Sequence, residues 1–310
     1  MVEFQRTHKV IILGAGPAGL AAALYTARAN LEPLVLTGAY LGGQASLTHM
    51  IENYPGFPEG ISGGDLTTAF SEQAERFGAH LEFEAATRVD LSRRPFRIFT
   101  DEQEYTTQSV IIATGATSRH LNVPGEKEFT GLGVSYCATC DGHFFRGKEI
   151  VVVGGGDSAV EEGLFLTRFA SKVTLVHRRD ELRAGPLLQK RAFDNPKLDF
   201  IWDSSISQIY GDEIVQGITL RNLKTGEQRE MAVNGVFVFI GYTPNTDIFR
   251  GQLHMDANGY LVIDRTMQSS VAGVFAAGEA ADSIYRQVVT SAGSGASAAM
   301  QAIRYLDEKD

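Results

Sequence analysis

Cysteine is scarce in this 310-residue chain, which contains two, Cys137 and Cys140. A secreted protein held together by disulfides would contain more, and two cysteines alone do not fill a four-ligand zinc site. The pair therefore indicates a reducing compartment, which we take to be the cytoplasm, and one local purpose for the two thiols.

Positive charge is also in deficit. Lys and Arg number 28 against 37 Asp and Glu, which gives a formal net charge of −9. An acidic chain is poorly suited to bind nucleic acid or an anionic membrane surface. We expect neither as a partner.

Long hydrophobic runs are absent from the sequence. The nearest approach runs from Val10 to Ala27 behind Arg6, His8 and Lys9, and it could be mistaken for a signal peptide. Three glycines and a proline between positions 14 and 19 interrupt it, and such residues break a continuous apolar helix. We interpret the run as a strand, a turn and a helix.

A βαβ unit occurs twice in the chain. Residues 9–13, K-V-I-I-L, predict a buried strand, and the loop Gly14–Gly19 reads G-A-G-P-A-G. A helical pattern and a second strand at 34–36 follow. The loop Gly154–Ala159, G-G-G-D-S-A, repeats this arrangement 140 residues later, with a helix to about Phe169 and a strand at 173–176. A repeat of this length indicates domain duplication.

A third segment near the C-terminus is too short to form a domain. A buried strand at 273–277 precedes Gly278 and Glu279, and a helix is expected from about Arg286 to Leu306. The sequence therefore predicts an α/β fold with two Rossmann-like dinucleotide-binding domains, the second inserted into the first. Residues 1–117 and 247–310 would form the first domain, for FAD, and residues 118–246 the second, for NADPH, which also carries both cysteines.

The glycine loops have a known physical role. The first glycine makes the turn, the second lets the backbone approach a pyrophosphate, and the third allows close packing of helix on strand. The helix N-terminus then faces the phosphates. The expected residues are Gly14, Gly16, Gly19 and Gly115 at the first site, and Gly154, Gly156, Asp157 and Ser158 at the second.

The two second-strand ends predict different cofactors. An acid at this position would bind a ribose 2′-hydroxyl, but the first copy ends in Thr37-Gly38. The second ends in His177, Arg178 and Arg179, with Arg183 nearby, and arginines suit a 2′-phosphate. We therefore expect NADPH at the second site and FAD at the first. The alternative is that these arginines form a solvated basic helix start.

Cys137 and Cys140 form a C-x-x-C-D motif with Asp141. Such a loop can cycle between dithiol and disulfide, and Asp141 is a candidate proton donor and acceptor for the exchange. Three alternatives remain open at this point: a zinc site with His143, although no fourth ligand is evident, inert buried cysteines, and an Asp141 that only caps a helix.

Together these motifs resemble the low-molecular-weight thioredoxin reductases of bacteria over nearly the whole chain. Besides the glycine loops and the C-x-x-C-D motif, the specific matches are G-G-Q at 42–44, E-N-Y-P-G at 52–56, H-R-R-D-E-L-R at 177–183 and Y-R-Q at 285–287. The resemblance implies a homodimer that passes electrons from NADPH to FAD, to the Cys137–Cys140 disulfide and then to a thioredoxin-like protein.

The same resemblance implies roles for individual residues. Cys140 would be the thiol nearest the flavin, and Cys137 its disulfide partner. Arg178, Arg179 and Arg183 would hold the 2′-phosphate. The flavin pocket would be lined by Thr37, Gly38, Gly42, Gly43, Gln44, Asn53, Gly278, Glu279, Arg286, Gln287 and Val288.

Three positions depart from the family pattern. The family usually has Asp in place of Glu279 and often Arg in place of Leu132, and His143 is also unusual. Leu132 motivates a second hypothesis in which the acceptor is a flavodoxin, a peroxiredoxin partner or oxygen. A third hypothesis is a redox-sensing binding protein that uses the cysteine pair as a switch.

Overall fold

The computed structural model describes residues 7–38, 40–48 and 50–308. Arg6, one of the charges before the first apolar run, lies outside them. The chain divides into two compact units, one of residues 1–117 and 243–310, the other of residues 118–242. The two crossing segments, β7 (Ala116–Ser118) and β16 (Tyr242–Pro244), pair as a two-stranded sheet. The fold class predicted from the sequence is confirmed.

The first unit is built on a seven-stranded sheet with the order β3-β2-β1-β6-β5-β4, with β17 also paired to β6. The pairs β1–β2, β1–β6, β2–β3 and β6–β17 are parallel, and β4–β5 and β5–β6 are antiparallel. The strands are β1 (His8–Leu13), β2 (Leu34–Leu36), β3 (His80–Glu82), β4 (Arg88–Asp90), β5 (Phe96–Phe99), β6 (Glu104–Ile112) and β17 (Val274–Ala276).

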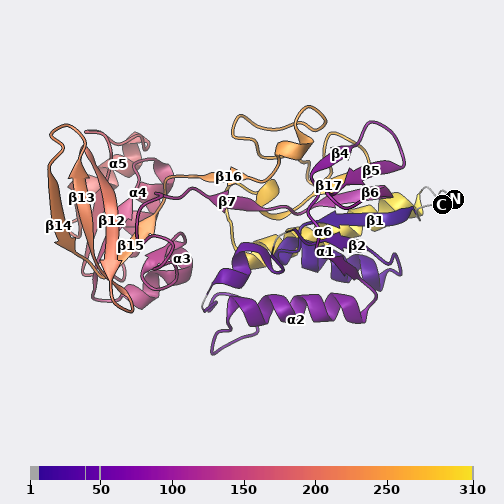
Figure 1. The fold of residues 1–310 in the computed structure, drawn as a ribbon, viewed down its shortest axis with the longest axis horizontal. Helices are drawn as coiled ribbons and strands as arrows, with labels where there is room; N and C mark the ends of the chain where they lie inside the picture. Colours follow the sequence, from indigo (N-terminus) through magenta and orange to yellow (C-terminus); the bar gives the residue numbers. More distant parts are fainter. Residues whose placement is uncertain (1–6, 39, 49, 309–310) are drawn as a thin grey trace. The chain divides into compact units, whose positions relative to one another are not determined.

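Helices of this unit pack against its sheet. Figure 1 shows α1 and α6 side by side against the sheet, where small residues of both helices form one buried cluster with strand residues. The helical segments are α1 (Pro17–Arg28), η1 (Gly43–Leu47), α2 (Gly63–Arg76), η3 (Asp247–Phe249), η4 (Gly278–Ala280) and α6 (Val288–Asp307).

The second unit has a parallel five-stranded sheet with the order β11-β10-β9-β15-β8 and a separate antiparallel sheet of β12, β13 and β14. Its strands are β8 (Val134–Ser135), β9 (Glu149–Val153), β10 (Lys172–Val176), β11 (Leu198–Ile201), β12 (Ser204–Gly211), β13 (Val215–Asn222), β14 (Gln228–Ala232) and β15 (Gly235–Val238). Its helical segments are α3 (Ala138–Asp141), η2 (Gly142–Phe145), α4 (Asp157–Leu166) and α5 (Pro186–Phe193).

Two predicted helix boundaries are wrong by a few residues. The C-terminal helix begins at Val288 rather than near Arg286, because Arg286 has a left-handed φ of +51°. The helix after the second glycine loop ends at Leu166 rather than Phe169. The predicted return of the C-terminal segment is confirmed, because β17 pairs with β6 in the first sheet.

Close packing of α6 on α1 predicts the effect of one added methyl group. A Cβ on Gly295 would lie 2.0 Å from the carbonyl oxygen of Ala18, so Gly295→Ala should lower the free energy of unfolding by about 1–3 kcal/mol. Gly293→Ala is the matched control in the same helix, since its Cβ would meet no described atom within 4 Å. Removing this helical glycine should stabilise by about 0.5–1 kcal/mol. Denaturant unfolding of both variants measures the difference, and equal effects would contradict the packing.

Candidate functional site

The first glycine loop joins β1 to α1 and leaves the backbone exposed where the helix begins. Gly14 has a φ of +102°, and a Cβ there would lie 2.3 Å from the carbonyl oxygen of Ala113. A Cβ on Gly19 would lie 1.8 Å from the oxygen of Gly14, so both positions need glycine. A Cβ on Gly16 would meet no described atom within 4 Å. This open space at the start of α1 suits a phosphate.

Residues that follow neighbouring parallel strands lie at the same edge of the first sheet. Gly38 follows β2 and Gly115 follows β6, both with positive φ and open space at the Cβ position. The Thr37 hydroxyl donates to the Gly38 carbonyl over 3.0 Å. The buried hydroxyl of Thr114 has no hydrogen-bond partner among the described residues, so a ligand at this edge would satisfy it.

The G-G-Q segment lies directly against the first glycine loop. The Gly42 amide donates to the Ala15 carbonyl over 2.9 Å. A Cβ on Gly43 would lie 3.2 Å from the Cα of Gly16. Gln44 follows in the short 3-10 turn η1. The structure therefore brings these predicted residues to the same place as Gly16.

Asn53 meets the start of α6, although the two are far apart in sequence. Its side-chain amide donates to Oε1 of Gln287 over 3.0 Å, and Gln287 caps the helix that begins at Val288. The guanidinium of Arg286 donates to the Tyr260 hydroxyl over 3.4 Å. The predicted Asn53 and Gln287 thus form one polar corner of the first unit.

Glu279 is a partly buried carboxyl group just past the carboxyl end of β17. The neighbouring Gly278 has a φ of +63°, and its amide donates to the Ser294 hydroxyl over 2.9 Å. Burial raises the pKa of Glu279 to about 7, the charge of Arg286 lowers it, and the charge of Asp282 raises it. At neutral pH this group can therefore either donate or accept a proton.

The second glycine loop joins β9 to α4 in the second unit. A Cβ on Gly154 would lie 2.5 Å from both the Ala159 Cβ and the Phe239 carbonyl oxygen. Gly156 caps α4, whose first two residues are Asp157 and Ser158. The Asp157 carboxylate accepts a hydrogen bond of 2.7 Å from the amide of Gly185, which fixes the return of the following loop.

The arginine-bearing loop folds back onto this glycine loop. The Arg183 amide donates to the Gly155 carbonyl over 2.7 Å, and its guanidinium lies 3.8 Å from the position of a Cβ on Gly156. Arg178 and Arg179 are exposed. The alternative of a basic helix start is wrong, because α5 begins only at Pro186.

The ring of His177 packs directly against the second glycine loop. His177 is 4% exposed, and a Cβ on Gly155 would lie 2.4 Å from its ring. Burial, followed by the charges of Arg183, Arg178 and Arg179, lowers the pKa of His177. Its Nε2 has no hydrogen-bond partner within the described part of the chain. The ring is therefore neutral near pH 7, with one nitrogen available to a ligand.

The cysteine pair forms a disulfide where β8 leads into α3, and the two Cα atoms are 5.3 Å apart. The Cys140 amide donates to the Cys137 sulfur over 3.2 Å. The Thr139 hydroxyl also lies 3.4 Å from that sulfur. These contacts favour negative charge on Cys137 once the disulfide opens. The alternative of inert buried cysteines is wrong, because the two are bonded to each other and neither is fully buried.

Asp141 stands at the N-cap position of η2, but its side chain makes no capping hydrogen bond. Its carboxylate accepts a 2.6 Å hydrogen bond from the Ser135 hydroxyl and makes no capping bond to η2. Burial raises the pKa of Asp141, whereas the Ser135 hydrogen bond and the charge of His143 lower it. The helix-capping alternative is therefore wrong, and Ser135 is a neighbour that the sequence did not reveal.

The stretch of sequence around the cysteines contains two exposed apolar side chains, Leu132 and Phe144. The ring of His143 lies 3.9 Å from that of Phe144, centroid to centroid. Phe144 is 44% exposed and Leu132 is 47% exposed. Both side chains are therefore exposed apolar surface of the second unit.

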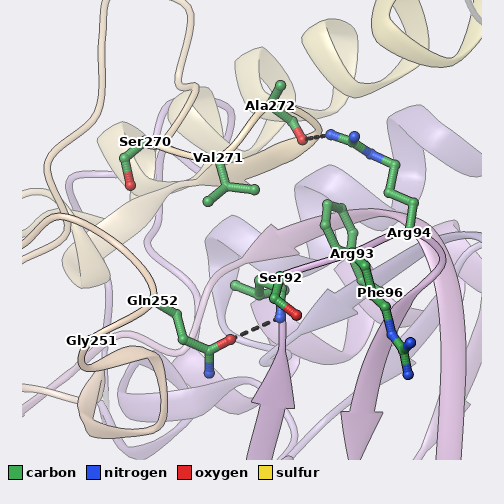
Figure 2. A pocket seen from close by; sticks show the side chains of 10 residues that line it. Ser92, Arg93, Arg94, Phe96, Gly251, Gln252, Ser270, Val271 and Ala272 are labelled. Carbon is green, nitrogen blue, oxygen red and sulfur yellow. Dashed lines mark hydrogen bonds between the residues drawn. The ribbon is translucent and has the colours of Figure 1, made fainter.

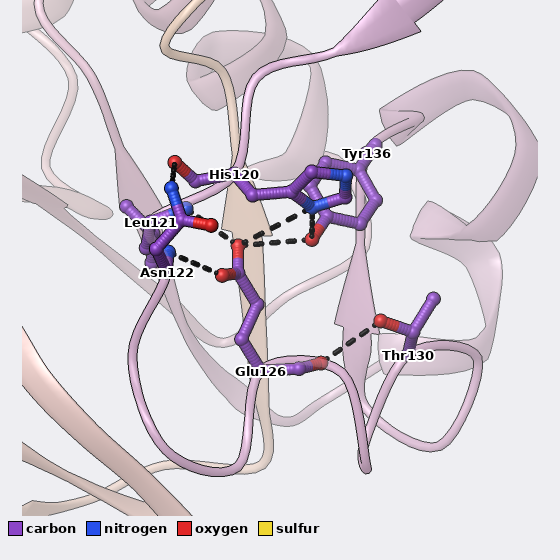
Figure 3. Close-up of polar contacts among 6 residues, drawn as sticks. All are labelled: His120, Leu121, Asn122, Glu126, Thr130 and Tyr136. Carbon is purple, nitrogen blue, oxygen red and sulfur yellow. Dashed lines mark hydrogen bonds and ion pairs between the residues drawn. The ribbon is translucent and has the colours of Figure 1, made fainter.

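A buried carboxylate organises the segment just before the cysteines (Figure 3). Glu126 accepts 2.7 Å hydrogen bonds from the amides of Leu121 and Asn122 and a 2.9 Å bond from the Tyr136 hydroxyl. His120 Nδ1 lies 2.8 Å from that hydroxyl. Burial, and then the bond to Glu126, raise the pKa of Tyr136. This network anchors the residue that precedes Cys137.

The first unit has a surface pocket of about 520 Å³, and hydrogen bonds connect the segments that line it (Figure 2). The Gln252 side chain accepts from the Leu91 amide and donates to the Val89 carbonyl, both over 2.8 Å. Arg94 donates to the Ala272 carbonyl. None of the predicted site residues lines this pocket, so we do not assign it a function.

The described residues offer neither a metal site nor a membrane span. They contain no group of three or more His, Cys, Asp or Glu side chains placed to hold a metal ion. None of their helices is long and apolar enough to cross a membrane.

Comparisons with known proteins agree with one another. Residues 8–295 match the pyridine nucleotide-disulphide oxidoreductase family. The chain is 50% identical to a thioredoxin reductase of Mycolicibacterium smegmatis over 100% of both chains. The crystal structure of thioredoxin reductase from Streptococcus pyogenes superposes with a TM-score of 0.93, at 43% identity over 97% of this chain and 99% of that one. Thioredoxin reductase from Giardia duodenalis gives 0.93 at 42% identity, over 98% and 100%.

The contacts of the two sulfurs predict unequal reactivity in the reduced protein. Limiting iodoacetamide near pH 7 should alkylate Cys137 about fivefold faster than Cys140, since one net hydrogen bond contributes about 1 kcal/mol. Peptide mass spectrometry measures both rates. Reduced protein unfolded in urea is the control, in which the two thiols should react alike. Faster alkylation of Cys140 in the folded protein would contradict the geometry.

Proposed function

The chain belongs to the low-molecular-weight thioredoxin reductases of the pyridine nucleotide-disulphide oxidoreductase family, and we propose that it passes electrons from NADPH through FAD and the Cys137–Cys140 disulfide to thioredoxin or a similar small thiol protein. It is an NADPH-dependent oxidoreductase with a redox-active disulfide. The observation that carries the proposal is this disulfide beside a partly buried acid, in the same unit as the arginine-bearing glycine loop.

We assign FAD to the first unit, residues 1–117 with the C-terminal segment from 247. Open space beside Gly16 and the partnerless hydroxyl of Thr114 support a dinucleotide there. Glu279 and Arg286 would lie toward the same group. A bound flavin would supply the two-electron relay between NADPH and the disulfide.

We assign NADPH to the second unit, residues 118–246. Gly156 would face the pyrophosphate, and Arg178, Arg179 and Arg183 would bind the 2′-phosphate by charge-assisted hydrogen bonds. Asp180, one of two acids in this loop, is paired with Lys224 over 3.0 Å, which reduces its repulsion of a phosphate. Lys224 is a neighbour that could not be predicted from the sequence.

The exchange with thioredoxin follows from the geometry of the turn. The Cys137 thiolate attacks one sulfur of the partner's disulfide and forms a mixed disulfide, releasing a partner thiolate. The Cys140 thiolate then attacks Cys137, restores the internal disulfide and releases the second partner thiolate. Two electrons pass to the partner, and the two protons of the enzyme dithiol finish on its thiols, with Asp141 as a proton carrier.

Assembly and location are part of the same proposal. The family relationship supports a homodimer, and the dithiol chemistry requires a reducing compartment such as the cytoplasm. Leu132 is exposed and departs from the family pattern, so other acceptor proteins are tested beside thioredoxin. Steady NADPH consumption with thioredoxin, but not with a flavodoxin or oxygen alone, tests the choice of acceptor. A sensor would consume NADPH with none of them.

Removing one thiol should separate the two half-reactions. Cys137→Ser and Cys140→Ser should leave NADPH-dependent bleaching of the flavin absorbance intact, because no thiol takes part in it. Thioredoxin reduction should fall to background, since serine cannot form the exchange disulfide. Ferricyanide reduction, which draws electrons directly from the flavin, is the control and should persist. Full thioredoxin activity in either variant would refute the disulfide mechanism.

The arginine loop should set the preference for NADPH over NADH. Replacing both Arg178 and Arg179 by Ala should lower kcat/KM for NADPH by about 10–100-fold, with little change for NADH, because each charge-assisted bond contributes about 1.5–3 kcal/mol before solvent screening. Arg229→Ala, an exposed arginine on β14, is the control. Equal use of the two nucleotides by the unmodified protein would overturn the assignment.

A further inference from the structure

Ser135 occupies a fixed position two residues before the first cysteine. It is the last residue of β8, its backbone is in register with Phe237 of β15, and it is 4% exposed. The strand pairing fixes the backbone, so the position of the hydroxyl is defined by the sheet rather than by a loop.

The Ser135 hydroxyl has three polar neighbours and one proton to donate. It accepts from the Cys137 amide over 3.1 Å, and it lies 2.6 Å from Oδ2 of Asp141 and 3.2 Å from the Cys137 carbonyl oxygen. The proton belongs on the shortest contact, toward Asp141. A distance of 2.6 Å is typical of a hydroxyl that donates to an ionised carboxylate.

Besides the Ser135 hydroxyl, burial opposes the charge of Asp141 and the charge of His143 favours it. On the α4 side, a Cβ on the adjacent Gly142 would meet Leu166 at 2.9 Å and Phe169 at 3.4 Å, so this side is apolar. On the η2 side, His143 is the titratable group whose charge acts on Asp141. The β8 side contributes the Ser135 hydroxyl. Within the described chain, this hydroxyl is therefore the neutral donor that favours the carboxylate.

We propose that Ser135 is a positioning residue that keeps Asp141 ionised and directed at the Cys137–Cys140 turn, ready to take the proton of a cysteine thiol. The proton moves from the thiol to the Asp141 carboxylate, the resulting thiolate attacks a disulfide sulfur, and Asp141 returns the proton to the thiolate that leaves. The Ser135 proton stays on its oxygen throughout. The proposal rests on the acid–base role proposed above for Asp141.

The direct test follows the ionisation of Asp141 itself. In the oxidised, FAD-loaded protein with ¹³C-labelled Asp carboxyl groups, the Asp141 resonance is the one missing from Asp141→Asn. Ser135→Ala should move its titration midpoint upward by about one to two pH units, because a bond to the charged form is lost. Ser135→Thr keeps the hydroxyl and should restore the midpoint. Ser204→Ala, which removes a buried hydroxyl that donates to a backbone carbonyl, should not move it.

The pH profile of thioredoxin reduction gives an independent readout. Activity should fall as pH drops through the Asp141 pKa, because the base becomes protonated, and Ser135→Ala should shift this acid limb upward by the same amount. Ser135→Ala combined with Asp141→Asn should show no shift relative to Asp141→Asn alone. Uniformly lower activity with an unmoved NMR midpoint would mean a merely structural role and would overturn the proposal.

The two levels of the hypothesis fail in different ways. If Asp141→Asn keeps the acid limb of the parent, the acid–base role of Asp141 is wrong, whatever the NMR midpoint does. If Asp141→Asn removes the limb but Ser135→Ala leaves both the limb and the NMR midpoint in place, only the role of Ser135 is wrong.

Discussion

The nucleotide loop of the first unit depends on one close contact, between Gly19 in the first turn of α1 and Gly14, the residue that follows β1. The position of a Cβ on Gly19 lies 1.8 Å from the Gly14 oxygen, so only a glycine lets α1 approach β1 this closely. In the second unit Ala159 occupies the position that corresponds to Gly19, so the helix there accommodates one additional methyl group. Both loops nevertheless present a helix N-terminus at the carboxyl edge of a parallel sheet, where nucleotides bind.

Much of the architecture could be predicted from the sequence because it rests on local patterns. Apolar strands, glycine loops and the 140-residue repeat of Gly14 at Gly154 are all visible in short windows. The helix boundary at Val288 was not, because no pattern in the sequence reveals the left-handed φ of Arg286. Whether the predicted residues bind FAD and NADPH is still a prediction, although the structure brings most of each set together.

Side-chain pairs across the fold could not be predicted at all. Asn53 and Gln287 are 234 residues apart, and Lys224 reaches Asp180 from a hairpin turn. Ser135 and Asp141 are near in sequence, but only the strand that ends at Ser135 turns its hydroxyl toward the acid. Hydrogen bonds of this kind leave no periodicity or composition signal, yet they make Glu126 an anchor for its segment. The burial that raises the pKa of Glu279 to about 7 leaves no such signal either.

The insertion of one unit into the other also sets an order of events during synthesis. Residues 118–242 leave the ribosome as a continuous segment that contains every strand of their own sheets. The first unit still lacks β17 and α6 at that moment, and at about 5–20 residues per second they emerge only seconds later. The nascent chain thus completes its inner unit before its outer one, and the apolar face of α1 waits for α6 as the last piece to arrive.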